Sequence, residues 1–375
     1  MIPIKNRKKN LEATVEEMRN FAFAYVEKYS PSKQQLRTYL LKKYLKSGSV
    51  NVSKKNIADL IDIVLEDLEK SKFINDKFYS SSKAKSLIQR GSSINKIRNY
   101  LISKGINNKY INEIIVIKYG GSAMLDKKLS LNFFQNIKAL VELDIKPIIV
   151  HGGGPQINLM LDKVNIKHKF FKGMRITDKK TFDIVEMILS GVINKNISYC
   201  LSNKKVNALG LSGVDSKIII AKKYRKKNIS DPDLGLVGQP SSINKNLLLT
   251  LVSYKIVPVI APIGANAKGT KFNINADLTA GFIASEIGAR RLLMLTDVKG
   301  VIGKDNKVIS ELKLSEVKKL MSKKIIYGGM IPKVKTCIEA VEAGIRASVI
   351  LDGKLNNVIL KELLSDEGIG TLFRK

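Results

Sequence analysis

The spacing of apolar residues changes near residue 112, and this change divides the chain into two regions. Before that point apolar residues recur at helical spacing. One helix is expected over 54–70, with an apolar face formed by Ile57, Leu60, Ile61, Val64, Leu65 and Leu68. Further helices are expected over 11–29 and 32–43, and a fourth ends at Gly91. Ser32 and Gln35 have the spacing of a capping box. Residues 1–112 are therefore predicted to form a small all-helical domain.

This helical region contains an internal repeat. Six residues between Ser32 and Lys43 recur, sixty-one positions later, between Ser93 and Lys104. Together with the stretches FAFAYVEKYSPSKQQLRTYLLKK and KFINDKF, they resemble the recombination regulator RecX, a family of tandem three-helix repeats. The resemblance covers about two repeats over residues 15–112, where the family has a third. A helical appendage kept for folding or assembly is the alternative interpretation.

From residue 113 onward, short apolar runs alternate with amphipathic segments. Strands are predicted at 113–118, 147–150, 207–211, 217–222, 257–260, 292–296 and 348–351. Helices are predicted at 131–143, 155–163, 181–196, 277–287, 314–321 and 333–343. This order predicts an α/β domain over 113–375, a three-layer αβα arrangement around a mainly parallel sheet. Two lobes that share one continuous sheet are expected.

Two of the predicted strands end in glycine-rich turns. Gly152–Gly154 follow strand 147–150, and Pro155 then stands where a helix would begin. Thirty residues earlier, Lys118 ends a strand just before Gly120 and Gly121. Each turn alone could be an ordinary tight connection. Together they form a βαβ unit, whose strand ends are where open α/β sheets bind ligands, and the helix start favours an anion.

Further polar residues stand at predicted strand ends and helix starts: Arg175 in GMRIT, Asn273, Asn275 and Asp277 in FNINAD, Asp297 in TDVKG, and Lys333 behind Gly328 and Gly329. The chain contains no GxxxxGK[ST], HRD or DFG motif, which disfavours the P-loop and protein-kinase designs. It has no GxSxG elbow, and no acidic partner is evident for His151 or His168. A hydrolase is therefore disfavoured.

Composition narrows the class of protein. The net charge of +32 comes from lysines spread along the whole chain, without Trp or Arg-rich tracts. Nucleic-acid binding is therefore disfavoured for 113–375 and left open for 1–112. Cys200 and Cys337 are isolated, which predicts reduced thiols in a cytoplasmic protein and no zinc site. No apolar run is long enough to span a membrane, and no apolar stretch follows the charged start, so a secretory signal is not expected.

Two lysines and several backbone N–H turns suit phosphoryl transfer to an anionic acceptor. A carboxylate nucleophile repels the γ-phosphate, so cationic and dipolar groups must offset the charge that develops during transfer. Such a nucleophile is already ionised at neutral pH and needs no general base. The lack of a suitably partnered histidine is consistent with this chemistry.

Several motifs then resemble the N-acetylglutamate kinases of the amino-acid kinase family: IVIKYGGSAM, PIIVHGGGPQIN, FFKGMRITD, VEMILSGVINKNI, LGLSGVD, NINADLTA, LTDVKGV, GGMIPKV and DEGIGTLF. The resemblance covers 113–375. KYGG differs from the KFGG of aspartokinases, the KLGTS of glutamate 5-kinases and the KLSGE of uridylate kinases. The resemblance implies ATP-dependent phosphorylation of the side-chain carboxylate of N-acetyl-L-glutamate, the second step of arginine biosynthesis.

The resemblance also implies roles for individual residues. Lys118 and Lys333 would stabilise the transition state, with Asp277 orienting them. Substrate would be held by Gly153, Gly154, Arg175 and Asn273. The nucleotide side would comprise Gly120, Gly121, Asp297 and Gly329. Mg²⁺ would ride on the ATP phosphates, so no protein metal ligand is expected.

The chain departs from the family's pattern at two places, one at a position not counted as catalytic and one that concerns assembly and regulation. Val214 replaces a common Lys. Feedback-inhibited members carry a helix just before the first strand that links dimers into a ring; its usual sequence is missing here, and the RecX-like residues stand in its place. The tail EGIGTLF nevertheless resembles that of arginine-sensitive members, so inhibition by arginine is left open. A homo-oligomer is expected. The alternative function is a non-catalytic regulatory scaffold whose N-terminal module contacts DNA or a recombinase.

Overall fold

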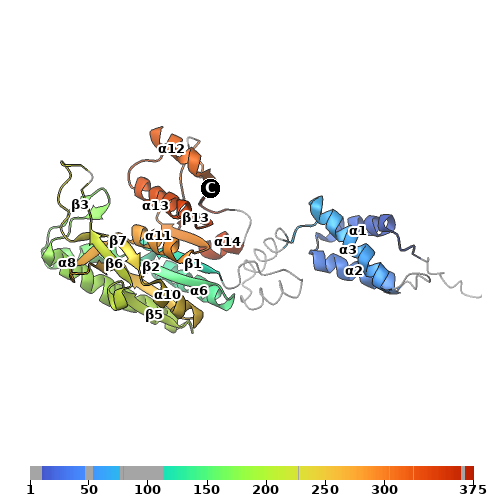
Figure 1. Cartoon of the computed structure of the whole chain (residues 1–375), viewed down its shortest axis with the longest axis horizontal. Coiled ribbons are helices and arrows are strands. Elements are labelled where there is room, and N and C mark those ends of the chain that lie inside the picture. Colours follow the sequence, from blue (N-terminus) through green and yellow to red (C-terminus); the bar gives the residue numbers. More distant parts are fainter. Residues whose placement is uncertain are drawn as a thin grey trace, which may run out of the picture. The chain divides into compact units, whose positions relative to one another are not determined.

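The computed structural model describes residues 11–46, 54–76, 79, 113–226, 228–303, 305–323, 325–364 and 368–375. The chain forms two compact units, and the boundary between them in the sequence lies between Lys109 and Tyr110 (Figure 1). Each unit is described by itself. Within the described residues, no helix combines the length and apolar character needed to cross a bilayer.

The first unit contains three described helices, α1 (Val15–Tyr29), α2 (Lys33–Lys46) and α3 (Lys54–Lys70). Helix α3 has the predicted bounds, whereas α1 starts later than position 11 and α2 runs past position 43. The capping box is confirmed, because Ser32 N donates to Gln35 Oε1 and Gln35 N donates to Ser32 Oγ. The core comprises Met18, Leu36, Leu40, Tyr44, Ile61, Leu65 and Leu68. The helix ending at Gly91 and the second repeat copy, 93–104, lie outside the described residues.

The second unit is built on an eight-stranded sheet with the order β12-β14-β13-β11-β1-β2-β8-β5. Its strands are β1 (Ile114–Tyr119), β2 (Lys146–His151), β5 (Ala208–Ser212), β8 (Val257–Ala261), β11 (Arg291–Thr296), β12 (Glu311–Lys313), β13 (Ala347–Asp352) and β14 (Thr371–Arg374). Neighbouring strands are parallel except β13 and β14. The carboxyl ends of β1, β2, β8 and β11 therefore share one edge.

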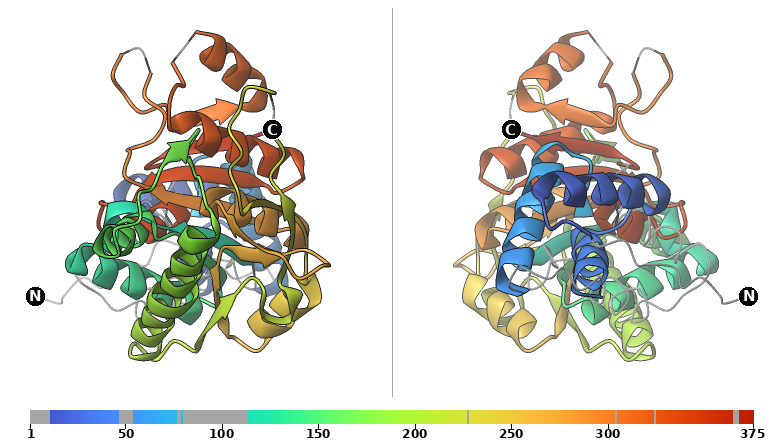
Figure 2. Two further views of the ribbon diagram at one scale, coloured as in Figure 1. Left: turned by 90° about the vertical axis from the view of Figure 1, so that its left-hand side faces the viewer. Right: turned by 90° about the vertical axis from the view of Figure 1, so that its right-hand side faces the viewer.

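Helices cover both faces of this sheet, as the alternating pattern predicts (Figure 2). One layer contains α10 (Lys245–Ser253), α11 (Ala276–Ile287) and α13 (Met330–Glu342), with α11 packed on β1, β2 and β11. The other contains α6 (Lys127–Glu142), α9 (Asn194–Ser202) and α14 (Val358–Leu364). A large apolar cluster lies between the sheet and the first layer, and further buried apolar residues of α6, α9 and α14 lie on the other side of the sheet. The three-layer α/β fold class is confirmed.

A second β structure lies beside the main sheet, which the expectation of one continuous sheet did not include. Four short strands close into a barrel: β6 (Ile219–Lys223), β7 (Val237–Ile243), β9 (Ile263–Ala265) and β10 (Lys271–Ile274). A hairpin of β3 (Phe170–Phe171) and β4 (Met174–Arg175) is separate from both. Only β6 was predicted, because β7 has no apolar run in its sequence VGQPSSI and the other strands have only two to four residues.

The remaining helices of the described part of the second unit are α7 (Gly154–Lys163), α8 (Lys179–Glu186) and α12 (Leu314–Ser322), with short 3₁₀ turns at Gly121–Met124 and Asp215–Lys217. The single helix predicted over 181–196 is wrong in its detail. A π-helical segment, Met187–Ile193, separates α8 from α9. Such segments change the direction in which the following side chains project, and they are frequent at functional sites.

Candidate active site

The two glycine turns meet at the carboxyl edge of the sheet. Strands β1 and β2 pair in register, with Tyr119 opposite His151, and Gly152 N donates to Tyr119 O at 2.8 Å. A methyl group placed on Gly152 would lie 3.9 Å from the Cα of Gly120. This close approach brings the two turns together as one continuous backbone surface.

Three charged side chains converge beside this surface. Lys118 comes from the end of β1, Asp277 from the first turn of α11, and Lys333 from the first turn of α13. Lys118 Nζ lies 3.0 Å from Asp277 Oδ1, and Lys333 Nζ lies 2.7 Å from Asp277 Oδ2. A Cβ on Gly120 would be 3.0 Å from Lys118 Nζ, so the ammonium lies directly over the first glycine turn.

The sequence places Asp277 through a helix cap that the motif search did not assign. Asn275 Oδ1 accepts hydrogen bonds from the backbone N–H groups of Asp277 and Leu278, at 2.8 and 3.1 Å. This N-cap starts α11 and holds Asp277 in its first turn, where the helix dipole favours a carboxylate. In the sequence, the order Asn-Ala-Asp at the start of the predicted helix was the signal for this cap.

The electrostatics of this lysine–aspartate cluster favour a bound anion. Burial alone would raise the pKa of Asp277, but the charges and hydrogen bonds of Lys118 and Lys333 outweigh it and lower the pKa to about 2. Asp277 is therefore ionised at neutral pH, and the cluster carries one net positive charge. A cluster of this charge beside backbone N–H groups suits a phosphate.

A cleft of about 270 Å³ opens next to the cluster. Eight of the predicted site residues line it: Lys118, Gly120, Gly121, Gly153, Gly154, Arg175, Asn273 and Asp277. Apolar side chains such as Ile157, Leu189 and Pro262 complete the lining. The cleft thus combines a cationic end, a glycine-rich floor and an apolar wall.

Arg175 reaches this cleft from strand β4 and is held by several contacts. Its Nη2 donates to Asn158 Oδ1 at 2.5 Å and to Gly154 O at 3.3 Å, and its guanidinium lies 4.6 Å from the centre of the Phe170 ring. Burial lowers its pKa to about 10, which leaves it charged at neutral pH. Its Nη1 is buried without a hydrogen-bond partner among the described residues. One donor of a fixed cation is therefore available to an anionic ligand.

The other predicted binding residues lie close to this arrangement. Asn273 on β10 donates to Thr177 Oγ1 at 3.2 Å. Gly121 has φ +75°, and a Cβ there would lie 2.7 Å from both carboxylate oxygens of Asp297. Gly329 precedes α13, one turn before Lys333. Lys333 belongs to the cluster, but neither it nor Asp297 nor Gly329 lines the cleft.

Sequence reasoning missed Asn158 and misjudged one histidine. Asn158 lies on α7 and contacts Arg175 of β4, which is distant in the sequence; its one signal was its place at the end of the motif PIIVHGGGPQIN. The expectation that His168 lacks an acidic partner is wrong, since its Nε2 lies 3.3 Å from Asp162 Oδ1. Over the part of the chain that the structure describes, no three His, Cys, Asp or Glu side chains gather as metal ligands.

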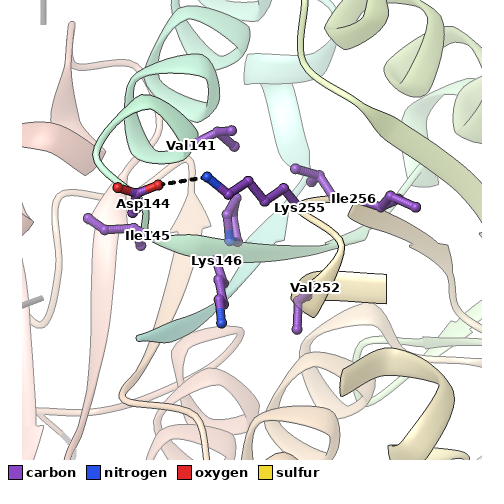
Figure 3. Close-up of a pocket in the computed structure, with 9 residues that line it drawn as sticks. Val141, Asp144, Ile145, Lys146, Val252, Lys255 and Ile256 are labelled. Carbon is purple, nitrogen blue, oxygen red and sulfur yellow. Dashed lines mark hydrogen bonds and ion pairs between the residues drawn. The ribbon is translucent and has the colours of Figure 1, made fainter. Parts of the chain in front are cut away.

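A second pocket lies at the opposite edge of the sheet and carries no comparable chemistry. It is lined by Val141, Asp144, Ile145, Lys146, Pro147, Val252, Lys255, Ile256 and Val257. Lys146 and Val257 begin their strands, so this pocket is at the amino ends of β2 and β8. Figure 3 shows the Lys255 ammonium directed at Asp144, 3.2 Å away, in an exposed ion pair. We therefore take the glycine-lined cleft as the candidate active site.

The fold and this cleft define a class of protein. Residues 113–351 match the amino acid kinase family, and the chain belongs to that family. Acetylglutamate kinase from Parvibaculum lavamentivorans is 48% identical over 275 residues, which cover 71% of this chain and 90% of that protein. Acetylglutamate kinase from Solidesulfovibrio magneticus is 46% identical over 272 residues, covering 71% and 91%.

A solved structure shows the same fold at low sequence identity. N-acetylglutamate synthase from Neisseria gonorrhoeae, complexed with coenzyme A and N-acetyl-glutamate, aligns with a TM-score of 0.64 and 19% identity. The alignment covers 71% of this chain and 60% of that chain. At this identity the likeness concerns the fold alone.

Proposed function

We propose that this chain is an acetylglutamate kinase, which transfers the γ-phosphoryl group of ATP to the side-chain carboxylate of N-acetyl-L-glutamate in the second step of arginine biosynthesis. The observation that carries the proposal is the cluster of Lys118, Asp277 and Lys333 beside two glycine turns, with Arg175 in the same cleft. Its sequence context is a chain 43–48% identical to proteins named acetylglutamate kinase.

In the proposed reaction, a carboxylate oxygen of the substrate attacks the γ-phosphorus while the bond from that phosphorus to the β–γ bridging oxygen breaks. The bonding electrons pass to the β-phosphate, and the products are an acyl phosphate and ADP. No proton has to be removed from the nucleophile. The enzyme therefore contributes positioning and charge stabilisation.

Each part of the site has a role in this scheme. Arg175 binds the α-carboxylate of the substrate through its unpartnered Nη1, and Asn273 adds a polar contact. The backbone N–H groups of Gly153 and Gly154 hold the γ-phosphoryl oxygens at the start of α7, where a helix has free donors. Lys118 and Lys333 offset the charge on the transferring group.

Asp277 pairs with both lysines and so directs their ammonium groups to the same place. A fixed carboxylate between two ammonium groups reduces the repulsion between them, and it sets both within 3.0 Å of its oxygens before substrate arrives. Charged groups that are already placed do not need to reorganise during the reaction.

On the nucleotide side we assign Gly120, Gly121, Asp297 and Gly329. Gly121 has a positive φ, and a Cβ there would collide with the carboxylate of Asp297, so no side chain fits at this position. This geometry is expected where the backbone approaches a ligand closely. Mg²⁺ is included in the proposal as an ion carried by the ATP phosphates, where it would neutralise developing charge.

The domain organisation and setting belong to the same proposal. We assign residues 113–375 as the catalytic domain and residues 1–112 as a RecX-like helical module. The resemblance to acetylglutamate kinases also leads us to expect a homo-oligomer. A cytoplasmic location fits the ATP substrate and the two free cysteines, Cys200 and Cys337.

The test is ADP release by the full-length protein, measured with N-acetyl-L-glutamate and, separately, with aspartate, glutamate and UMP. We expect turnover with N-acetyl-L-glutamate in the presence of Mg²⁺ and its loss when the metal is chelated. The acyl phosphate product should be trapped by hydroxylamine as a hydroxamate. Turnover with one of the other acceptors, and none with N-acetyl-L-glutamate, would refute the substrate assignment.

A further inference from the structure

His151 is a buried polar residue to which the mechanism above gives no role. It is the last residue of β2 and directly precedes Gly152–Gly154. Its side chain has no solvent exposure. The two ring nitrogens nevertheless have distinct partners, because Nδ1 lies 2.9 Å from Gly152 O and Nε2 lies 3.1 Å from Asn194 Nδ2.

The partners of Asn194 determine which nitrogen of His151 carries the proton. Asn194 Nδ2 also lies 2.8 Å from Val259 O and 3.1 Å from Leu211 O. Carbonyl oxygens only accept hydrogen bonds, so the amide nitrogen of Asn194 must face them. An N–H group at His151 Nε2 would then point at a second donor. The ring is therefore protonated at Nδ1, and Nδ1–H donates to Gly152 O.

The backbone around Asn194 explains how one amide reaches three strands. Asn194 is the first residue of α9, directly after the π-helical segment Met187–Ile193. Its amide nitrogen contacts Leu211 O on β5, Val259 O in the middle of β8 and His151 Nε2 on β2. The same π-helical segment packs on the glycine turn, since a Cβ on Gly153 would collide with Leu189 and Ile193.

The hydrogen bond to Gly152 O has a direct consequence for Gly153. A peptide unit is planar and trans, so fixing the carbonyl of residue 152 also fixes the N–H of residue 153, on the opposite side of the bond. Gly153 lines the cleft. With no Cβ, a glycine peptide has more freedom to rotate than any other, and an external anchor restricts that freedom.

We propose that His151 is a positioning residue, which acts through its Nδ1–H bond to Gly152 O to hold the Gly153 N–H in the orientation that binds the transferring phosphoryl group. The role of the Gly153 N–H rests on the function proposed above. Asn194 is the partner that holds the ring in the required tautomer. Neither side chain touches the reacting atoms.

The protonation state of the ring is consistent with this role. Burial lowers the pKa of His151 to about 4, against the opposing effect of its hydrogen bond to Gly152 O. The ring is therefore neutral from pH 6 to pH 8, and a neutral ring has only one N–H to give.

Two substitutions separate the positioning role from simple filling of space. In His151→Asn, the amide nitrogen can occupy the place of Nδ1 and still donate to Gly152 O. In His151→Gln, the terminal amide group can occupy the place of Nε2 and accept from Asn194, but no donor stands near Gly152 O. Gln is the larger side chain, so a space-filling role predicts that Gln is tolerated better than Asn.

We expect the opposite order in kinetic measurements on the full-length protein. His151→Gln should lower kcat about 10- to 100-fold, the size of effect that a misplaced binding group produces. His151→Asn should stay within about fivefold of wild type, since it loses only one neutral hydrogen bond. The KM for ATP should change little in either variant. Thermal unfolding of both variants checks that they fold.

The tautomer itself can be observed without any assay of activity. The chain has two histidines, so ¹⁵N labelling of histidine gives two rings, and His168→Gln assigns them. We expect a pyrrole-type Nδ1 and a pyridine-type Nε2 for His151, unchanged between pH 6 and pH 8. An Nε2–H tautomer, or a ring that titrates in this range, would overturn the proposal.

The two experiments also distinguish the inference from the proposed function. If wild type is active with N-acetyl-L-glutamate but Gln is tolerated better than Asn, the positioning role is wrong and the kinase assignment stands. If wild type phosphorylates a different acceptor, the same two variants are compared on that acceptor, and the ¹⁵N result is unaffected.

Discussion

Deleting the charge of Lys333 is the sharpest test of the proposed mechanism. Lys333→Met keeps the length and apolar character of the side chain and removes the ammonium that lies 2.7 Å from Asp277 Oδ2. The lysine–aspartate cluster then changes from one net positive charge to none. Asp277 keeps its contact with Lys118, so the carboxylate remains ionised and paired.

The size of the effect follows from the charge that is lost. At an effective dielectric constant of about 20, one unit charge about 4 Å from the transferring group contributes about 4 kcal/mol. Losing one pre-placed donor in other active sites costs about 2.7–4 kcal/mol, which is a factor of about 10²–10³ in kcat. We therefore expect kcat to fall about 10²–10³-fold. The KM values should change less, because the charge migrates only during transfer.

The assay is ADP release at saturating N-acetyl-L-glutamate and ATP, with kcat and KM determined separately and thermal unfolding as a check of folding. Lys335→Met is the matched control, because Lys335 lies on the same helix, two residues away, and is exposed to solvent. The control should behave as wild type. Activity of Lys333→Met within about threefold of wild type, far short of the expected loss, would refute the role of Lys333, as would an equal loss in both variants.

Three further predictions concern substrate binding, stability and the N-terminal module. Arg175→Lys should raise the KM for N-acetyl-L-glutamate about 10- to 100-fold and leave that for ATP unchanged, because lysine keeps the charge but not the planar fork; equal changes in both KM values would contradict this. The pKa of Asp277 is about 2 in the folded protein, against an ordinary value of 3.8. Its ionised form therefore contributes about 2 kcal/mol to the free energy of unfolding above pH 3.8, and this contribution is lost as the pH falls toward 2. Urea unfolding of Asp277→Asn should show that deficit at pH 7, with the gap to wild type narrowing below pH 4; a gap that grows on acidification would show the opposite sign. A chain starting at Lys109 should keep phosphoryl transfer, since no proposed site residue precedes Lys118; a folded but inactive truncation in the ADP assay would show that the module completes the site.

Local pattern was enough to determine much of the secondary structure. The apolar face of 54–70 specifies α3 because residues three and four apart on a helix face the same side. Ser32 and Gln35 begin α2 because their side chains satisfy each other's backbone N–H groups. The apolar runs of β1 and β2, each followed by glycines, predicted the βαβ unit, because a short continuous apolar run is typical of a parallel strand that is buried on both faces.

Tertiary structure alone decided which side chains meet. Lys118, Asp277 and Lys333 are far apart in the sequence, and they converge only because β1 is central in the sheet and α11 and α13 start at the same edge. The contact of Arg175 with Asn158 joins strand β4 to helix α7. Such contacts join residues at large sequence separation, which no local periodicity encodes.

The barrel and the π-helical segment show the same limit for backbone structure. Strands β9 and β10 have only three or four residues, so each depends on pairing with its neighbours rather than on its own composition. Residues 181–196 have an unbroken helical pattern, yet the segment Met187–Ile193 adopts π geometry. There the geometry is decided by the packing of Leu189 and Ile193 on Gly153 and by the contacts of Asn194 with β2, β5 and β8, because tertiary contacts outweigh the small differences between helical forms.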